Sequence, residues 1–138
     1  MSHRAIVKTV INDLDMLKKT IKDLGSSYYE GQELTGSYTS NWTAEQRKAD
    51  IVMDMGGRKD IGFRKTTDGF YSLIGDFFGL AMSEKALSDK VAQRYSVNKI
   101  RKEISNSSSY GINSLSERTL ANGEIVLEGE IDEQQILA

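Results

Sequence analysis

The order of apolar and polar positions along this chain predicts an alternation of strands and helices. Residues 3–11 are rich in β-branched side chains, which favours a first strand. Residues 13–24 then carry apolar side chains at helical spacing, with charged residues on the other faces. Asn12 and Asp13 supply side chains that can cap this helix, and Gly25 stands where a left-handed residue ends one. This segment gives the clearest local prediction in the chain.

The centre of the chain has the two-residue alternation that is typical of strands. Residues 26–42 mix aromatic residues with Gly, Ser and Thr, which indicates a short strand and a loop. Two turn signals follow, Gly56-Gly57 and Asp68-Gly69, each between apolar runs. Three consecutive strands joined by these turns form an antiparallel meander. They are predicted in the second half of 43–55, over 59–65 and over 70–76.

A second helical region follows the meander. Ser83 is a candidate N-cap for a helix over 83–95, and a further helical stretch covers 97–105. With 3.6 residues per turn, the apolar face of the second stretch is rotated by roughly a quarter of a turn from that of the first. This rotation predicts a kink or break near Ser96.

The last predicted element is a hairpin. Residues 106–111 form a polar loop. Beyond it, Asn122-Gly123, the strongest short hairpin signal, separates strands over 112–120 and 124–131.

The element order β-α-β-β-β-α-(α)-β-β defines the fold class. Strands that run in groups with helices between them are typical of α+β proteins. We therefore predict an antiparallel sheet with two main helices packed on one face. The length suggests a single domain over residues 1–131, with a frayed tail at 132–138.

Composition narrows the chemistry that is available. The 138 residues include no cysteine, no proline, one histidine and one tryptophan. Without cysteine there is no disulfide, cysteine-zinc site, iron-sulfur cluster or thiol catalysis. A Ser-His-Asp triad would need His3 as its base. We therefore expect no cofactor, and the turns must rely on Gly, Asn, Asp and Ser.

The sequence shows no signal for export or membrane insertion. Its start, MSHRAIVKTV, lacks the long apolar stretch of a signal peptide. No run reaches the roughly 18 apolar residues that a spanning helix needs. We expect a cytoplasmic protein, or one in the equivalent compartment of an organelle or infected cell, with no membrane partner.

Several short segments, in order along most of the chain, are similar to those of one known family. They are Met1-Ser2-His3, residues 13–19 (DLDMLKK), residues 60–63 (DIGF), residues 91–95 (VAQRY) and the Asn122-Gly123 hairpin. Together they resemble the hypothetical chloroplast reading frame thirty-five family, uncharacterised proteins of cyanobacteria and plastids with relatives in phages. The resemblance implies no settled enzymatic activity. It also implies that the genes often occur beside one for an AAA-type ATPase.

Four carboxylates surround the central meander, namely Asp54, Asp60, Asp68 and Asp76. Carboxylates brought together can bind Mg²⁺ or act as acid and base, so a metal-dependent enzyme is one hypothesis. Asp60 and Asp68 also lie beside hairpin turns, where Asp is favoured for its hydrogen bonds to the backbone. Turn chemistry and solvated faces are the interpretation that we favour, with no metal site.

Residues 90–102 form a basic segment with five cations and no acid. A cationic helix that includes an aromatic residue is typical of a nucleic-acid contact. Residues 117–138 hold six acids against one arginine, so the basic helix can pair with an acidic hairpin in the same chain or with an acidic protein partner. A pI near 5.5 argues against strong polyanion binding. The candidate contact residues are Arg94, Tyr95, Lys99 and Lys102.

Residues 70–82, FYSLIGDFFGLAM, form the most apolar stretch, with nine apolar residues in thirteen. Burial of a central strand accounts for its first part. The last part lies between a strand and a helix, where an exposed apolar loop is a surface for a protein partner. The candidate contact residues in this loop are Phe77, Phe78 and Leu80.

These observations favour a non-enzymatic binding module, a subunit or adaptor in a protein assembly, with the link to an AAA-type ATPase that the resemblance implies. A homo-oligomer is a further alternative that the sequence leaves open. The alternatives are a nucleic-acid-contacting accessory protein that uses the helix over 90–102, and a metal-dependent enzyme that uses the four aspartates.

Overall fold

The computed structural model of the protein describes residues 4–80, 82–105 and 112–131. The chain divides into two compact units, Met1–Arg94 and Tyr95–Ala138. None of the helices in the described residues is long and apolar enough to cross a membrane.

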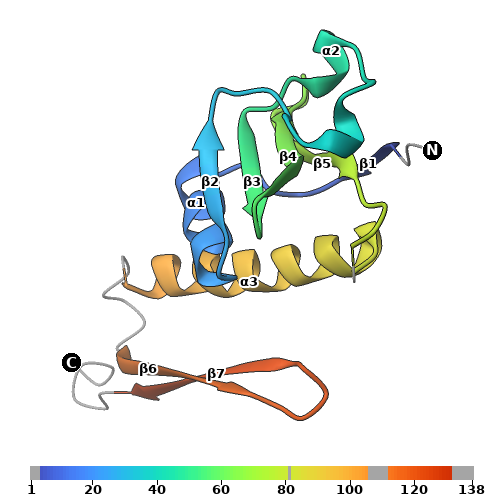
Figure 1. The fold of residues 1–138 in the computed structure, drawn as a ribbon. Coiled ribbons are helices and arrows are strands. Elements are labelled where there is room, and N and C mark those ends of the chain that lie inside the picture. The colour runs from blue at the N-terminus through green and yellow to red at the C-terminus, as the bar shows by residue number, and fades with distance from the viewer. Residues whose placement is uncertain (1–3, 81, 106–111, 132–138) are drawn as a thin grey trace. The chain divides into compact units, whose positions relative to one another are not determined.

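The first unit is built on a five-stranded sheet with the order β1-β5-β4-β3-β2 (Figure 1). Every neighbouring pair is antiparallel, and the central strands β3, β4 and β5 form the meander that the sequence predicts. The centre of the sheet is therefore made of sequential hairpins, and β1 is added at the edge beside β5. The strands are β1 (Arg4–Lys8), β2 (Ser27–Glu30), β3 (Ile51–Met55), β4 (Arg58–Lys65) and β5 (Tyr71–Asp76).

The two tight turns of the meander use glycine and aspartate as predicted. Gly56 and Gly57 have φ angles of 68° and 89°, a left-handed conformation that two-residue hairpin turns require. The Asp54 carboxylate accepts the N–H of Gly57 at 2.6 Å. In the next turn, hydrogen bonds from the Thr66 hydroxyl and then from the Phe70 N–H lower the pKa of the Asp68 carboxyl.

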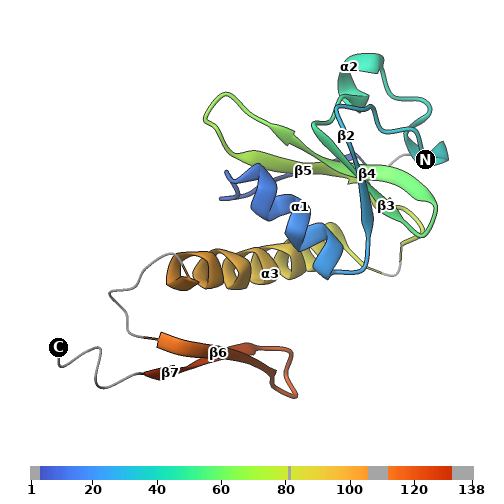
Figure 2. The same cartoon turned by 90° about the vertical axis from the view of Figure 1, so that its left-hand side faces the viewer.

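The helix α1 (Leu14–Asp23) confirms the prediction for residues 13–24. The Asp13 carboxylate caps its start by accepting the N–H of Met16 at 3.1 Å, and Gly25 follows its end. One stripe of the helix is buried, and α1 lies with the first half of α3 on the same face of the sheet (Figure 2). The predicted α+β class is thereby confirmed.

The second long helix, α3 (Glu84–Ser105), is continuous, so the predicted break near Ser96 is wrong. The Ser83 hydroxyl accepts the N–H of Ala86 at 3.1 Å and caps the start, as predicted. No glycine or proline interrupts the helix afterwards. Leu87, Val91, Tyr95 and Asn98 are buried at spacings of four and three, so one buried stripe continues past Ser96, whereas Ile100 of the predicted second face is 44% exposed.

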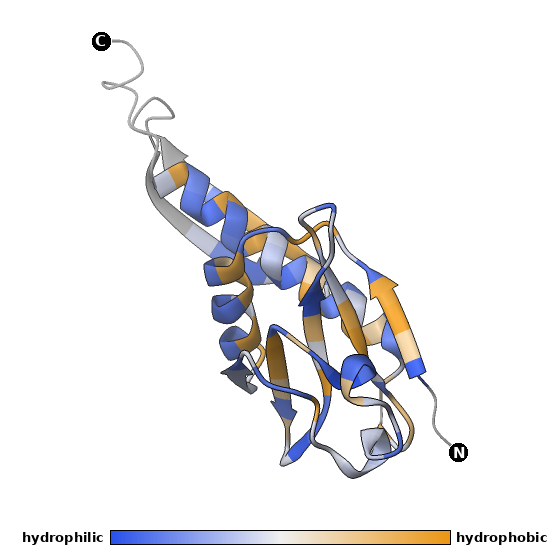
Figure 3. Cartoon of the chain, turned by 90° about the horizontal axis from the view of Figure 1, so that it is seen from above, coloured by the Kyte–Doolittle hydropathy of each residue, from blue (hydrophilic) through white to orange (hydrophobic). Residues whose placement is uncertain are grey.

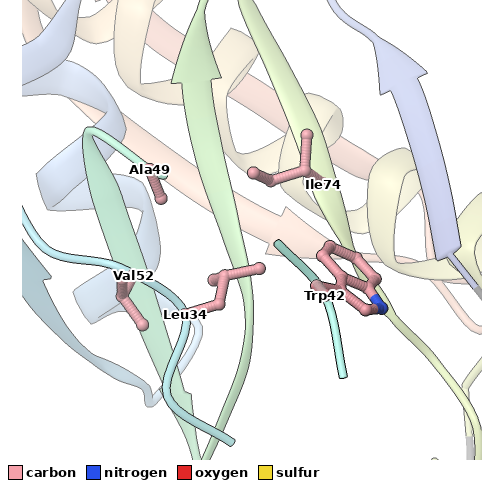
Figure 4. Packing of buried hydrophobic residues seen from close by; sticks show 5 residues of the cluster. All are labelled: Leu34, Trp42, Ala49, Val52 and Ile74. Atoms are coloured by element: carbon pink, nitrogen blue, oxygen red, sulfur yellow. The ribbon is translucent and has the colours of Figure 1, made fainter. Parts of the chain in front are cut away.

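The other face of the sheet is covered by the segment between β2 and β3, which includes two elements that the sequence pattern did not predict. These are η1 (Ser37–Thr39) and α2 (Ala44–Arg47). The short α2 is held by a reciprocal capping box between Thr43 and Gln46. The segment contributes three buried apolar side chains that pack on Val52 and Ile74 of the sheet (Figure 4). They are Leu34, Trp42 and Ala49.

The second unit contains the C-terminal hairpin, β6 (Ile112–Thr119) and β7 (Ile125–Ile131), as predicted. The side chain of Asn122 accepts the N–H of Glu124 at 3.0 Å within the turn. Within this unit, the Arg101 guanidinium of α3 lies 3.0 Å from the Glu117 carboxylate of β6. The predictions for the loop at 106–111 and the tail at 132–138 fall outside the described residues.

Candidate functional site

A buried ion pair organises one end of the sheet in the first unit. Arg58 and Asp60 alternate on β4, so their side chains point to the same face. The Nε–H of Arg58 donates to Asp60 Oδ2 at 3.0 Å, and Asp60 is fully buried. Its other oxygen, Oδ1, accepts the backbone N–H and the hydroxyl of Thr39 at 3.0 and 3.1 Å. Both oxygens of a buried carboxylate are therefore satisfied, which removes most of its desolvation cost.

The segment before Thr39 packs directly on this carboxylate. The N–H groups of Thr35 and Gly36 donate to the Lys59 carbonyl at 3.1 and 3.2 Å. A Cβ added to Gly36 would lie 2.1 Å from the Asp60 carboxylate atoms, a distance that real contacts do not reach. Glycine is therefore required here so that the loop can close over Asp60.

Arg58 also joins this loop to the end of β5. Its Nη2–H donates to the Asp76 carbonyl at 2.7 Å. The guanidinium carbon Cζ lies over the Tyr38 ring, 4.0 Å from its centre, within the range of a cation–π contact. One arginine thus connects η1, β4 and β5, and it fixes the position of Tyr38.

The chain after β5 turns sharply and presents an aromatic side chain at the surface. The carboxylate of the fully buried Asp76 accepts the N–H of Phe78 at 2.9 Å, which closes the turn. Phe77 points inward and is buried, whereas Phe78 is 48% exposed. The rings of Tyr38 and Phe78 lie 5.7 Å apart at an angle of 54°. We call these two side chains the aromatic pair; Tyr38 is 37% exposed.

A cleft of about 480 Å³ opens beside the aromatic pair. It lies between the start of β1, the turn after β5 and the start of α3, and we call it the Phe78 cleft. Both polar and apolar groups contribute to its walls. The lining includes Arg4, Ala5, Phe77, Phe78, Leu80 and Met82.

The structure separates the three residues of the predicted partner-binding loop. Phe78 is exposed, Phe77 belongs to the core, and Leu80 is half-buried at the wall of the Phe78 cleft. Phe77 and Phe78 differ because they are consecutive residues in the turn that Asp76 closes, so their side chains point to opposite sides.

The residues of the basic segment lie in different environments. Tyr95 is buried, because it follows Val91 by one helical turn on the same apolar stripe of α3. Its ring is therefore not available for stacking on a base. Arg101 is paired with Glu117, in line with the internally paired alternative. Of the other predicted contact residues, Arg94 and Lys99 are half-buried and Lys102 is exposed.

The four aspartates of the meander serve separate purposes. Asp54 and Asp68 accept backbone N–H groups in turns, Asp60 pairs with Arg58, and Asp76 closes the turn before Phe78. In the part of the chain that the structure describes, no three acidic or histidine side chains are grouped to hold a metal ion.

Sequence reasoning missed the residues that position the aromatic pair, namely Gly36, Tyr38, Thr39 and Arg58. One signal was available. Arg58 and Asp60 place opposite charges two positions apart in a strand whose centre, residues 61–63, is apolar and buried. A charge on the covered face of a central strand requires a partner, so this spacing indicates a buried ion pair.

The fold and the site together define a class: a small α+β protein with a five-stranded antiparallel sheet and a surface aromatic pair held by a buried ion pair. Residues 20–127 match the family described as "Protein of unknown function (DUF1257)". The chain is 32% identical to the "Uncharacterized protein ycf35" of Guillardia theta over 130 residues, 92% of this chain and 94% of that protein.

A second relative has the same description. It is the "Uncharacterized protein ycf35" of Pyropia yezoensis, 30% identical over 105 residues, 75% of this chain and 78% of that protein. The chain therefore belongs to the ycf35 family, which confirms the resemblance seen in the sequence. No solved structure matches the chain significantly.

Proposed function

We propose that this protein is a non-enzymatic binding module, a subunit or adaptor in a protein assembly, and that it contacts its partner through the aromatic pair. The observation that carries the proposal is that Phe78 is exposed but held in place. Its backbone is fixed by Asp76, and its ring contacts Tyr38, which Arg58 holds in turn.

A fixed aromatic side chain at the surface is suited to binding. Ordering a side chain on association costs about 0.5–1.5 kcal/mol, and a side chain that is already ordered avoids most of that cost. Aromatic residues and arginine are also enriched among the residues that dominate binding energy. The Phe78 cleft adds a concave surface next to the aromatic ring. A protein partner can therefore insert a side chain beside Phe78.

The two alternatives are less well supported by the site. The nucleic-acid hypothesis depends on a basic helix in which Tyr95 is buried and Arg101 is paired within its own unit. The metal-dependent enzyme requires aspartates to converge, and the structure gives each of them a protein hydrogen-bond donor. We therefore favour the protein-binding function.

Affinity capture from native lysate tests this proposal. We expect the tagged protein to recover one dominant partner, and we expect Phe78→Asp to reduce the recovery by about 30-fold or more, as for a central interface residue. Phe70→Asp is the matched control, because Phe70 is a similarly exposed aromatic residue on the β4–β5 turn, away from the cleft. Mass spectrometry of the captured material also shows whether the partner is an AAA-type ATPase.

Two results would contradict the proposal. One is equal recovery by the wild type and Phe78→Asp, with Phe70→Asp also unchanged. The other is a protein that elutes from native lysate as a monomer without a partner. Circular dichroism spectra and thermal unfolding of both variants should match those of the wild type, because both side chains are at the surface.

A further inference from the structure

The strand β1 forms one edge of the five-stranded sheet. Within the described residues, β1 pairs with β5 alone, so alternate N–H and C=O groups point away from the sheet. On β2, the strand at the opposite edge, Tyr28 and Tyr29 each have a lysine over the ring, and Glu30 binds Lys18 at 2.5 Å. Figure 3 shows β1 at the margin next to the N-terminus, with a hydrophobic centre and hydrophilic ends.

The side chains of β1 form a defined pattern on one face. Arg4, Ile6 and Lys8 alternate along the strand, so they share a face. Ile6 is paired with Ile74 of β5, which belongs to the buried cluster with Trp42. Ile6 itself is 53% exposed. The apolar core therefore reaches solvent at Ile6, with a cation on each side of it.

This charge pattern selects the kind of strand that can be added. An antiparallel second copy of β1 centred on Ile6 would place Arg4 opposite Lys8 at both ends. A parallel copy in register would place each cation opposite itself. Like charges directly opposite one another destabilise a strand pair, whereas opposite charges stabilise it. A second copy of this chain is therefore a poor occupant, and a strand with acidic residues at these positions is a good one.

We propose that β1 accepts an extended segment of the partner as an additional strand of the sheet, with an apolar residue opposite Ile6 and acidic residues opposite Arg4 and Lys8. This inference rests on the proposed function and names the class of partner. Arg4 is already oriented, because its guanidinium lies 5.4 Å from the centre of the Trp42 ring. Arg4 also lines the Phe78 cleft, so a strand that continues past it enters the cleft. Main-chain hydrogen bonds then supply affinity and the side-chain pattern supplies specificity.

Titration of the isotope-labelled protein with short capped peptides tests this inference by NMR. The first peptide has glutamate, valine and glutamate at alternate positions with threonine between them, and the second has lysine in place of both glutamates. We expect the acidic peptide to shift the amide signals of β1 and of the Phe78 cleft, and the basic peptide to shift neither. An added strand uses one of its two edges. Methylation of one alternate set of peptide nitrogens should therefore abolish binding, and methylation of the other set should leave it intact.

A charge exchange identifies the register. Lys8→Glu should weaken binding of the acidic peptide by about tenfold, because an attractive cross-strand pair becomes repulsive. A peptide with one lysine and one glutamate should restore binding to this variant in one of the two possible orders, which also reports the direction of the added strand. Lys65→Glu is the control, because it makes the same change of charge at an exposed position on β4, away from the edge.

Three outcomes overturn the inference. They are equal binding of the acidic peptide by Lys8→Glu and the wild type, binding that neither pattern of nitrogen methylation removes, and a dimer that Ile6→Lys dissociates. The last would mean that a second copy occupies β1. If the acidic peptide does not bind but Phe78→Asp still lowers partner recovery, strand addition at β1 is rejected. The proposed function is then retained. If the acidic peptide binds and the Phe78→Asp variant recovers as much partner as the wild type, the role of Phe78 is rejected instead.

Discussion

Replacing Asp60 by alanine is expected to lower the free energy of unfolding by about 3 kcal/mol or more, because it leaves a half-buried guanidinium without its carboxylate. Arg58 would lose the hydrogen bond from its Nε–H, and Thr39 would lose an acceptor for both its N–H and its hydroxyl. Urea denaturation measures the loss. Trp42 is the one tryptophan of the chain and is buried in the same unit, so its fluorescence reports unfolding.

Two further variants make this prediction specific. Asp60→Asn keeps the shape of the side chain and an acceptor oxygen but removes the charge, so it should cost less than Asp60→Ala. Gly36→Ala leaves the ion pair chemically intact but inserts a Cβ 2.1 Å from the carboxylate, and it should destabilise the protein through steric conflict. A loss below about 0.5 kcal/mol for Asp60→Ala, the size of an ordinary surface change, would show that the network does not hold this end of the sheet.

The same variants report on the aromatic pair. Because Arg58 positions Tyr38 by direct contact, disorder of the guanidinium should extend to Tyr38 and then to Phe78. Partner capture by Asp60→Asn should therefore fall even at temperatures where the variant is fully folded. A folded Asp60→Asn with full recovery would mean that Phe78 needs no support from the ion pair.

Replacing Trp42 by alanine is expected to cost about 3–5 kcal/mol, the range for removal of a large aromatic side chain from a core. Trp42 is buried against Ile74 and Leu34 in the layer above the sheet (Figure 4). This layer has no regular element longer than the four residues of α2, so few other contacts can compensate for its loss. Thermal unfolding followed by circular dichroism measures the effect, since this variant has no tryptophan fluorescence.

Trp42→Phe is the matched control for this core position. It retains an aromatic ring and should cost clearly less than the alanine variant. Trp42→Ala should also weaken the binding of the acidic peptide to β1, because Arg4 loses the aromatic ring over which its guanidinium lies. Equal stability of Trp42→Ala and the wild type would show that the segment over the sheet is not part of the cooperative core.

The accuracy of the sequence predictions followed the range of the interactions involved. The helix over 13–24 and the turns at Gly56-Gly57 and Asn122-Gly123 were predicted closely, because their capping and turn chemistry acts between residues a few positions apart. The break near Ser96 was wrong for a related reason. The apolar residues of the sequence suggested two faces, but the positions that are buried, Val91, Tyr95 and Asn98, continue one stripe, so the helix needs no interruption.

The candidate site was only partly accessible from the sequence. The apolar loop that contains Phe78 was identified by composition, but Phe77 and Phe78 look alike in the sequence and differ in burial. Their difference is set by the Asp76 carboxylate, which closes the turn. The residues that support Phe78 come from positions 36–39, 58–60 and 76–79. No local pattern connects segments that are so far apart in the chain.

By itself, the sequence determined the α+β class, the order of the elements, the turns and the ycf35 family, since each depends on periodicity, local turn chemistry or similarity along the chain. Only the tertiary structure decided which charges are buried as a pair, which phenylalanine is presented to solvent and that β1 lies at an edge of the sheet with Ile6 exposed. Burial and strand order depend on contacts between residues distant in sequence. Such contacts result from the whole chain folding together, so no single segment of the sequence reveals them.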